Sequence, residues 1–190
     1  KGKQETYLLD EVELNTALLQ AALDNAQLVV SPEAPALSPT AFENLATEYQ
    51  QYRAIVNRLS TRFPSAFLHA LLTLPPLTDD LLSNADNLGQ WMRALSNFLN
   101  ESCPPGERYA IEATELGDTA HTAMTLTRMR HGIPETSAIP GDFFRGADYS
   151  RIRSLADKLD GLIEPGAYVL RGEKKKEIET FADGLDWLVE

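Results

Sequence analysis

The sequence predicts an α+β fold, with a helix-rich first half and with short antiparallel strands and helices in the second half. In the first half, apolar residues recur every three or four positions, which is the period of a helix with one buried face. After Gly106 the period changes to two, and β-branched threonine becomes frequent. The composition, 43% hydrophobic and 24% charged over 190 residues, supplies enough apolar side chains for a folded core.

The first predicted elements are a short strand over residues 6–9 and a helix that follows it. Asp10 and Glu13 have the spacing of a capping box, in which side chains accept the free amides of a first helical turn. We therefore expect a helix to about Asp24. Its apolar face, which we expect to lie against a core, comprises Leu14, Leu18, Leu19, Ala22 and Leu23.

A β-prone stretch and a proline-rich segment separate this helix from the next. Residues 27–30 favour a strand, whereas residues 31–39 predict irregular backbone because proline lacks an amide donor. Ser38 is a good N-cap, and Pro39 suits the first helical position. The helix that follows has the strongest periodic signal, and we expect it to be the longest. Its apolar face comprises Phe42, Leu45, Ala46, Tyr49, Tyr52, Ile55, Val56 and Leu59.

Two further helices complete the first half. One begins at Pro64 and is stopped by Pro75-Pro76. The other ends before Cys103-Pro104-Pro105-Gly106, a run that cannot continue a helix. Their apolar stripes comprise Phe67, Leu68, Leu71 and Leu72 in the first helix and Leu88, Trp91, Met92, Leu95 and Leu99 in the second.

The second half is predicted to open with two antiparallel strands. Tyr109, Ile111 and Ala113 alternate with polar residues, and residues 122–130 are rich in threonine. A loop is expected over residues 133–141, ahead of Phe143-Phe144. The next helix should end before Pro165-Gly166. Its apolar residues are Ile152, Leu155, Ala156, Leu159 and Ile163.

The last segment is predicted to be a hairpin followed by a terminal helix. Residues 168–170 would pair with the region of Ile178 across a charged turn at residues 172–176. Thr180 and Asp183 have the spacing of a capping pair. The terminal helix would then turn three apolar side chains inward, namely Phe181, Leu185 and Leu188.

Charge and cysteine content narrow the classes of function. Seventeen Lys and Arg against 28 Asp and Glu give a net charge of −11, which disfavours broad nucleic-acid binding. The single cysteine, Cys103, excludes an internal disulfide and a Cys-based zinc cluster, and it suits a reducing cytoplasm. The most apolar run, residues 66–77, is interrupted by His69 and by prolines. Because a membrane span needs ~20 apolar residues, we expect none.

The sequence contains no recognisable motif for catalysis or metal binding. We therefore predict no catalytic residue, metal or cofactor in this chain. His69, His121 and His131 are too scattered for zinc-ligand spacing, and Cys103 has no recognisable catalytic partner. The glycines at positions 141 and 146 lack the Gly-Lys-Ser/Thr ending of a phosphate loop. Two pairs of nearby acidic residues could bind a cation, but we interpret them as residues at a helix start or on a solvated helix face. They are Asp79-Asp80 and Asp157 with Asp160.

Two basic clusters stand against the acidic background. Arg128 and Arg130 share a strand face and are followed by His131. A solvated strand face is the favoured interpretation, and a local contact with DNA or with a partner is the alternative, for which these arginines are the first candidates. The other cluster, Arg171 with residues 174–176, is flanked by glutamates. We interpret it as a solvated hairpin tip, with a phosphate contact as the alternative.

The chain resembles a known protein family in the order and spacing of many short segments. No single motif is sufficient to show this resemblance. Examples are Asp24-Asn25, Asp148-Tyr149 and Asp186-Trp187. The matching segments are residues 1–8, 22–28, 34–37, 48–49, 57–58, 63–64, 146–152, 158–162, 171–173 and 185–189. Together they resemble the insertion within the Toprim region of the DNA gyrase B subunit from Gram-negative bacteria. The DNA gyrases are type IIA DNA topoisomerases. The resemblance to this family is weakest over residues 77–127.

The resemblance implies a division of the chain. Residues 1–9 would end a Toprim-type strand, and residues 10–180 would be the insertion. Within it, a helical part would cover about 10–102 and a mixed strand and helix part about 107–180. Residues 181–190 would form a helix leading back to the parent domain. The start without methionine and the unfinished helical pattern at the end fit a piece of a longer protein.

The resemblance also implies a noncatalytic structural and coupling role. The parent enzyme negatively supercoils DNA at the expense of ATP. Three of its sites lie outside this segment, namely the ATP site, the magnesium-binding acids and the tyrosine nucleophile of the gyrase A subunit. The implied partners are the remainder of the gyrase B subunit, the gyrase A subunit, and DNA through the parent complex. The alternative is an interaction module that recruits a regulator or the A subunit, or that contacts DNA through Arg128 and Arg130.

Overall fold

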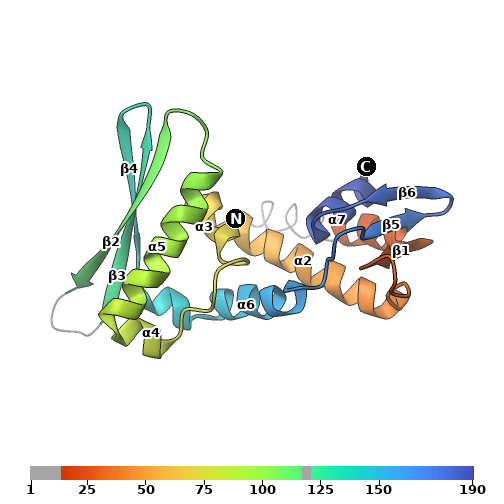
Figure 1. The fold of residues 1–190 in the computed structure, drawn as a ribbon, viewed down its shortest axis with the longest axis horizontal. Coiled ribbons are helices and arrows are strands. Elements are labelled where there is room, and N and C mark those ends of the chain that lie inside the picture. Colours follow the sequence, from red (N-terminus) through yellow and green to blue (C-terminus); the bar gives the residue numbers. More distant parts are fainter. Residues whose placement is uncertain (1–13, 117–120) are drawn as a thin grey trace, which may run out of the picture. The chain divides into compact units, whose positions relative to one another are not determined.

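The computed structural model describes residues 14–116 and 121–190 and confirms an α+β fold with two antiparallel sheets (Figure 1). The strand expected at residues 6–9 and the capping pair of Asp10 and Glu13 lie outside the described residues. The described residues form two compact units, one within residues 14–51 and 158–190 and the other within residues 52–116 and 121–157. The division of the chain implied by the resemblance stays a prediction.

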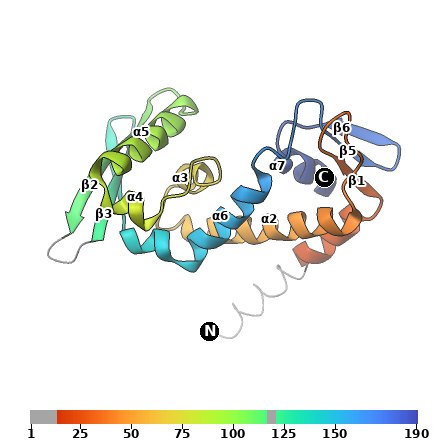
Figure 2. The same cartoon turned by 60° about the horizontal axis from the view of Figure 1, so that its bottom comes forward.

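The first unit is built on a three-stranded antiparallel sheet. Its strands are β1 (Ala26–Val29), β5 (Tyr168–Arg171) and β6 (Lys174–Glu177), in the order β1-β5-β6. The terminal helix α7 (Phe181–Val189) lies beside this sheet (Figure 2). The predicted strand at residues 27–30 and the predicted hairpin are thus confirmed. Residues 174–176 belong to β6 rather than to the turn, which is only two residues long.

Helix starts in this unit follow the predicted capping chemistry. Helix α2 (Pro39–Leu59) begins at Pro39, and the Ser38 Oγ accepts a hydrogen bond from the Ala41 amide at 3.2 Å. In α7 the Thr180 and Asp183 side chains form the reciprocal capping box. Helix α2 has 21 residues and is the longest helix in the described part of the chain, as expected.

One sequence prediction in this unit is wrong. Residues 14–23 are helical, but only Leu19 and Ala22 of the predicted apolar face are buried. Leu14 and Leu18 are exposed, and Leu23 is partly exposed. Periodicity identifies the helix, but it does not show how much of the apolar stripe a neighbouring element covers.

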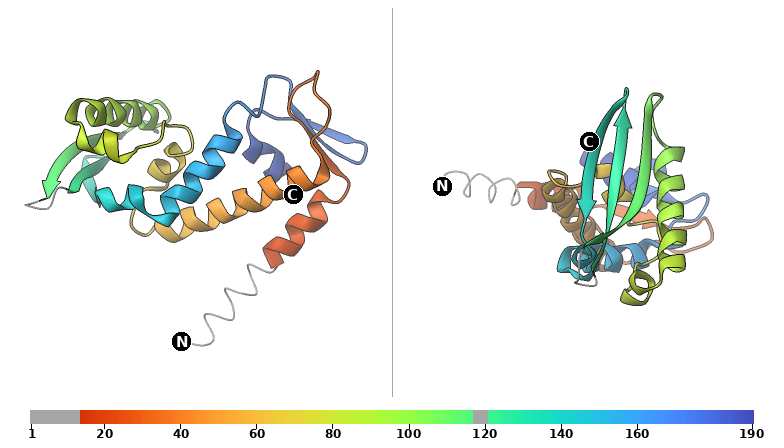
Figure 3. Two further views of the ribbon diagram at one scale, coloured as in Figure 1. Left: turned by 90° about the horizontal axis from the view of Figure 1, so that it is seen from below. Right: turned by 90° about the vertical axis from the view of Figure 1, so that its left-hand side faces the viewer.

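The second unit contains helices and a three-stranded sheet. Its elements within residues 52–157 are α3 (Ser65–Ala70), α4 (Asp79–Ser83), α5 (Ala85–Glu101), β2 (Glu107–Leu116), β3 (His121–Arg130), β4 (Ile133–Ile139), the 3-10 helix η1 (Gly141–Arg145) and most of α6 (Ala147–Leu159). The sheet order is β2-β3-β4, and both pairings are antiparallel. Helix α5 runs along the β2 side of the sheet (Figure 3).

Strand β4 corrects the expectation of a loop over residues 133–141. His131 and Gly132 have φ angles of 48° and 82°, so they form a two-residue turn that returns the chain directly along β3. Pro134 argues against a central strand, but β4 is an edge strand, where a missing amide donor is tolerated. The sequence has a glycine at the turn, yet it lacks the usual Asn-Gly or Asp-Gly signal.

The other edge of this sheet is covered by a side chain of α5. The Asn100 Oδ1 accepts from the Tyr109 amide at 2.9 Å, and the Asn100 Nδ2 donates to the Tyr109 carbonyl at 3.0 Å. The Asn100 side chain therefore makes the two bonds that a neighbouring strand would make. Among the helices of residues 14–116 and 121–190, none combines the length and the apolar composition of a membrane span.

Candidate partner-contact site on the β2-β3-β4 sheet

The candidate residues Arg128 and Arg130 lie at the end of β3 that meets the turn to β4. Their spacing of two puts both side chains on one face of the sheet. In the antiparallel register, Arg130 lies opposite Glu107 of β2 and Arg128 lies opposite Tyr109. The sheet therefore brings together two guanidinium groups, a carboxylate and an aromatic ring.

One carboxylate holds both arginines. The Arg128 Nη2 and Nε atoms donate to the Glu107 Oε2 at 2.6 and 3.1 Å, and the Arg130 Nε lies 3.2 Å from the Glu107 Oε1. The Glu107 side chain is only 7% exposed. Hydrogen bonding from Arg128, aided by the charges of both arginines, lowers the pKa of Glu107. Glu107 is thus ionised at neutral pH and fixes both guanidinium groups.

The two arginines differ in their further contacts and in the exposure of their side chains. Arg128 is also 5.9 Å from the Tyr109 ring centroid, a cation–π distance, and lies opposite Glu135 of β4. Burial raises the pKa of Tyr109, so the ring stays neutral. Arg130 has a 52% exposed side chain, and its Nε is paired with Glu107. The cluster can therefore bind an anionic group, mainly through Arg130.

His131 belongs to the turn that follows the two arginines. Its backbone forms the turn with a positive φ, and its amide donates to the Gly106 carbonyl at 3.0 Å. Glu107 is the participant that the sequence alone did not indicate. Because it is over 20 positions from Arg128, only the pairing register of β2 and β3 reveals it.

The second basic cluster is part of the β5-β6 hairpin and has structural contacts. The Arg171 Nη1 donates to the Leu188 carbonyl at the end of α7 at 3.1 Å, a position where a cation stabilises the helix dipole. The Lys175 Nζ lies 4.1 Å from the Tyr168 ring centroid. A shallow hollow beside the hairpin is lined by Arg171, Glu173, Lys174, Trp187 and Glu190. Its mixed charges agree with a solvated hairpin tip.

Comparison with protein families identifies the chain. Residues 26–190 match the family described as the DNA gyrase B subunit insert domain. The chain belongs to this family. The match covers both units of the fold, including the β2-β3-β4 sheet where the sequence resemblance was weakest.

Two of the remaining candidates for chemistry, His69 and Asp79, have structural partners. The His69 Nδ1 and the Tyr52 hydroxyl are 2.6 Å apart, and burial, with a smaller effect of Arg53, lowers the pKa of His69. Asp79 begins α4, as predicted, and accepts from Arg145. Cys103 is a free, half-buried thiol. Over the ranges that are described, no three potential metal ligands among His, Cys, Asp and Glu converge.

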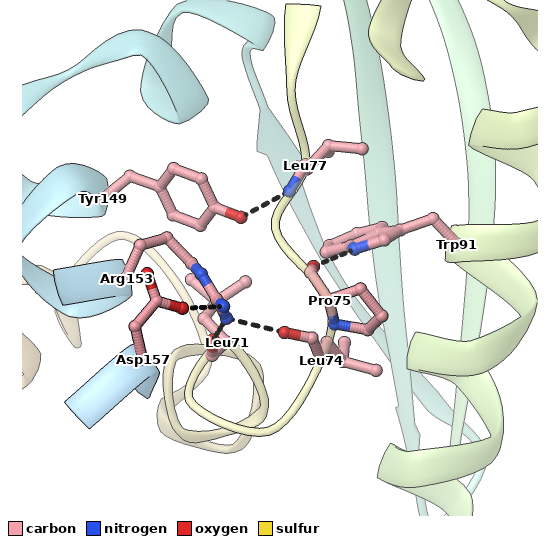
Figure 4. Close-up of polar contacts among 8 residues, drawn as sticks. All are labelled: Leu71, Leu74, Pro75, Leu77, Trp91, Tyr149, Arg153 and Asp157. Carbon is pink, nitrogen blue, oxygen red and sulfur yellow. Dashed lines mark hydrogen bonds and ion pairs between the residues drawn. The ribbon is translucent and has the colours of Figure 1, made fainter. Parts of the chain in front are cut away.

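A group of polar contacts fixes the Pro75-Pro76 segment of the insert (Figure 4). The Arg153 Nη1 donates to the carbonyls of Leu71 and Leu74 at 3.1 and 2.6 Å, and its Nη2 lies 3.0 Å from Asp157. The Tyr149 hydroxyl accepts from the Leu77 amide at 2.8 Å. The Trp91 Nε1 donates to the Pro75 carbonyl at 2.9 Å. Helices α5 and α6 therefore supply the partners that this non-helical backbone requires.

Proposed function

We propose that the chain is a noncatalytic structural and coupling insert of the DNA gyrase B subunit. Its role would be to help couple DNA binding to ATP turnover in an enzyme that negatively supercoils DNA. The observation that carries this proposal is the family match over residues 26–190, which is to an insert and not to a catalytic domain. The fold and the contacts of its ionisable side chains are the supporting arguments.

The ionisable groups support a structural role because the pairs that they form hold elements together. Glu107 joins the ends of β2 and β3, Arg153 fixes the segment between α3 and α4, and Arg145 binds Asp79 at the start of α4. A supporting scaffold needs such pairs, whereas an enzyme needs a poised and accessible group.

The remaining parts of the proposal follow from the family resemblance. ATP and magnesium would be bound by other domains of the parent, and no cofactor would be held by this segment. The partners would be the remainder of the gyrase B subunit, the gyrase A subunit, and DNA through the assembled complex. The proposed setting is the cytoplasm of a Gram-negative bacterium. Arg128 and Arg130 remain the candidates for a local contact with DNA or with a protein.

The noncatalytic half of the proposal is tested with the isolated chain. We expect the pure chain to hydrolyse no ATP and to cleave no DNA, with or without magnesium. Intact gyrase assayed in parallel is the positive control. Robust turnover by the isolated chain that persists through further purification would contradict the proposal.

A further inference from the structure

The tip of the β3-β4 hairpin, residues 129–134, is a tight turn in contact with the residues that precede β2. Arg130 pairs with Ile133, so the turn consists of His131 and Gly132, both with positive φ, as in a tight type I′ turn. The His131 amide binds the Gly106 carbonyl. A Cβ placed on Gly106 would lie 3.1 Å from the His131 Nδ1, so the histidine ring packs directly on this glycine. The tip is therefore held against the chain that enters β2.

This tip exposes apolar and cationic groups together. Ile133 is 67% exposed, although most large apolar side chains in the described residues are buried. Met129 is 41% exposed but lies on the opposite face of the sheet from Arg130, because it is one position away along β3. Arg130 lies directly opposite Ile133 in the register, so the two side chains are neighbours on one face. The Nη atoms of Arg130 make no hydrogen bond within the described part of the chain, and the Arg130 side chain is 52% exposed. Arginine is enriched in protein interfaces, and the fully buried centre of an interface is more apolar than the rest of the surface.

The β5-β6 hairpin shows that a tight turn in this fold does not require exposed apolar residues. It has the same turn length, with Gly172 and Glu173 between Arg171 and Lys174. Strand β6 consists of three lysines and a glutamate, all exposed. Ile133 and Met129 are therefore not explained by hairpin formation alone, and their exposure costs solvation free energy in the free chain.

We propose that the hairpin tip is a docking surface for a protein segment that presents a carboxylate beside an apolar side chain. The carboxylate would accept hydrogen bonds from the Nη atoms of Arg130, and the apolar group would cover Ile133. Glu107 acts as a positioning residue because it holds the Arg130 Nε. A nucleic-acid backbone fits less well, since it offers no apolar group to Ile133 and the chain carries a net charge of −11.

The proposal is tested by titrating the isotope-labelled 190-residue chain and observing its amide resonances. The probes are a short peptide of alternating leucine and glutamate, the same peptide with lysine in place of glutamate, and a short DNA duplex. We expect the glutamate peptide to shift the resonances of His131, Gly132 and Ile133 in a saturable manner. Ile133→Ser and Arg130→Gln should each weaken that binding about five- to tenfold.

Matched variants at other exposed positions are the controls. Leu18→Ser removes another exposed apolar side chain, and Lys174→Gln removes a cation beside the other two-residue turn. Both should bind the glutamate peptide like the wild type. Spectra that superimpose outside the tip show that each variant is folded. The proposal is overturned if the tip resonances do not move, if the lysine peptide moves them equally, or if DNA moves them regardless of Ile133→Ser.

Discussion

At the scale of single residues, the fold of the insert depends on a few side chains that satisfy groups far away in the sequence. Glu107 binds two arginines of β3, and Tyr149 accepts the amide of Leu77. None of these pairs is suggested by local sequence spacing. The arginines could be placed on one strand face from their spacing of two, but the carboxylate between them follows only from the strand register.

The Glu107 cluster predicts a specific dependence of stability on pH. Because the pKa of Glu107 is lowered in the folded chain, its contribution is present above the ordinary carboxyl pKa of 4.5. That contribution is lost as the pH falls through the folded-state value. Glu107→Gln should therefore lower the urea midpoint at neutral pH, and the difference from the wild type should shrink in acid.

Glu112→Gln is the control for this variant, because Glu112 is an exposed residue of the same strand. We expect its urea midpoint to follow that of the wild type at every pH. A difference between Glu107→Gln and the wild type that stays constant from neutral pH into acid would show that ionisation of Glu107 does not stabilise the fold.

Tyr149 gives a second prediction at this scale. Tyr149→Phe leaves the buried Leu77 amide without its acceptor, so the free energy of unfolding should fall by about 1–3 kcal/mol. Tyr109→Phe is the matched control. Its ring is also buried, but its hydroxyl makes no hydrogen bond in the described part of the chain. Equal losses for the two variants in urea unfolding would refute a role for the Leu77 contact.

At the scale of elements, the helices were the most predictable part of the fold. The α2 start at Ser38-Pro39 and the capping box of α7 follow from side chains near in sequence. Strand β4 was missed because Pro134 and a turn without the usual Asn-Gly signal resemble a loop. Whether Leu14 and Leu18 are covered could not be predicted either, because burial depends on neighbouring elements.

Two helix glycines provide a matched test of element packing. In α7, a Cβ on Gly184 would lie 2.9 Å from the Cγ2 of buried Val169 in β5, a stiff β-branched side chain. In α5, a Cβ on Gly89 would meet nothing within 4 Å. Gly184→Ala should lower the free energy of unfolding by about 1–3 kcal/mol despite better helix propensity. Gly89→Ala should raise it by up to about 1 kcal/mol.

Thermal and urea unfolding of both alanine variants check this pair of predictions. The opposite signs are the decisive result, because helix propensity alone would stabilise both variants. If Gly184→Ala were as stabilising as Gly89→Ala, helix α7 would not pack against β5 as closely as the structure indicates.

At the scale of the whole molecule, the chain is an acidic member of the gyrase B insert family with two compact units. Its net charge of −11 fits a role in which DNA is bound mainly by other parts of the parent enzyme. The absence of a catalytic motif was a prediction from the sequence, and it stays one. The family was recognisable because matching segments recur in order, which does not require any single residue to be catalytic.

The most direct test of the coupling role uses reconstituted gyrase in which the B subunit lacks residues 10–180 and the cut ends are joined by a short flexible linker. Supercoiling and ATP turnover are measured with and without DNA, beside the intact enzyme. A coupling role predicts that ATP turnover without DNA is retained, whereas its stimulation by DNA and the supercoils introduced per ATP both fall. Unchanged stimulation and an unchanged ratio of supercoils to ATP would contradict that role.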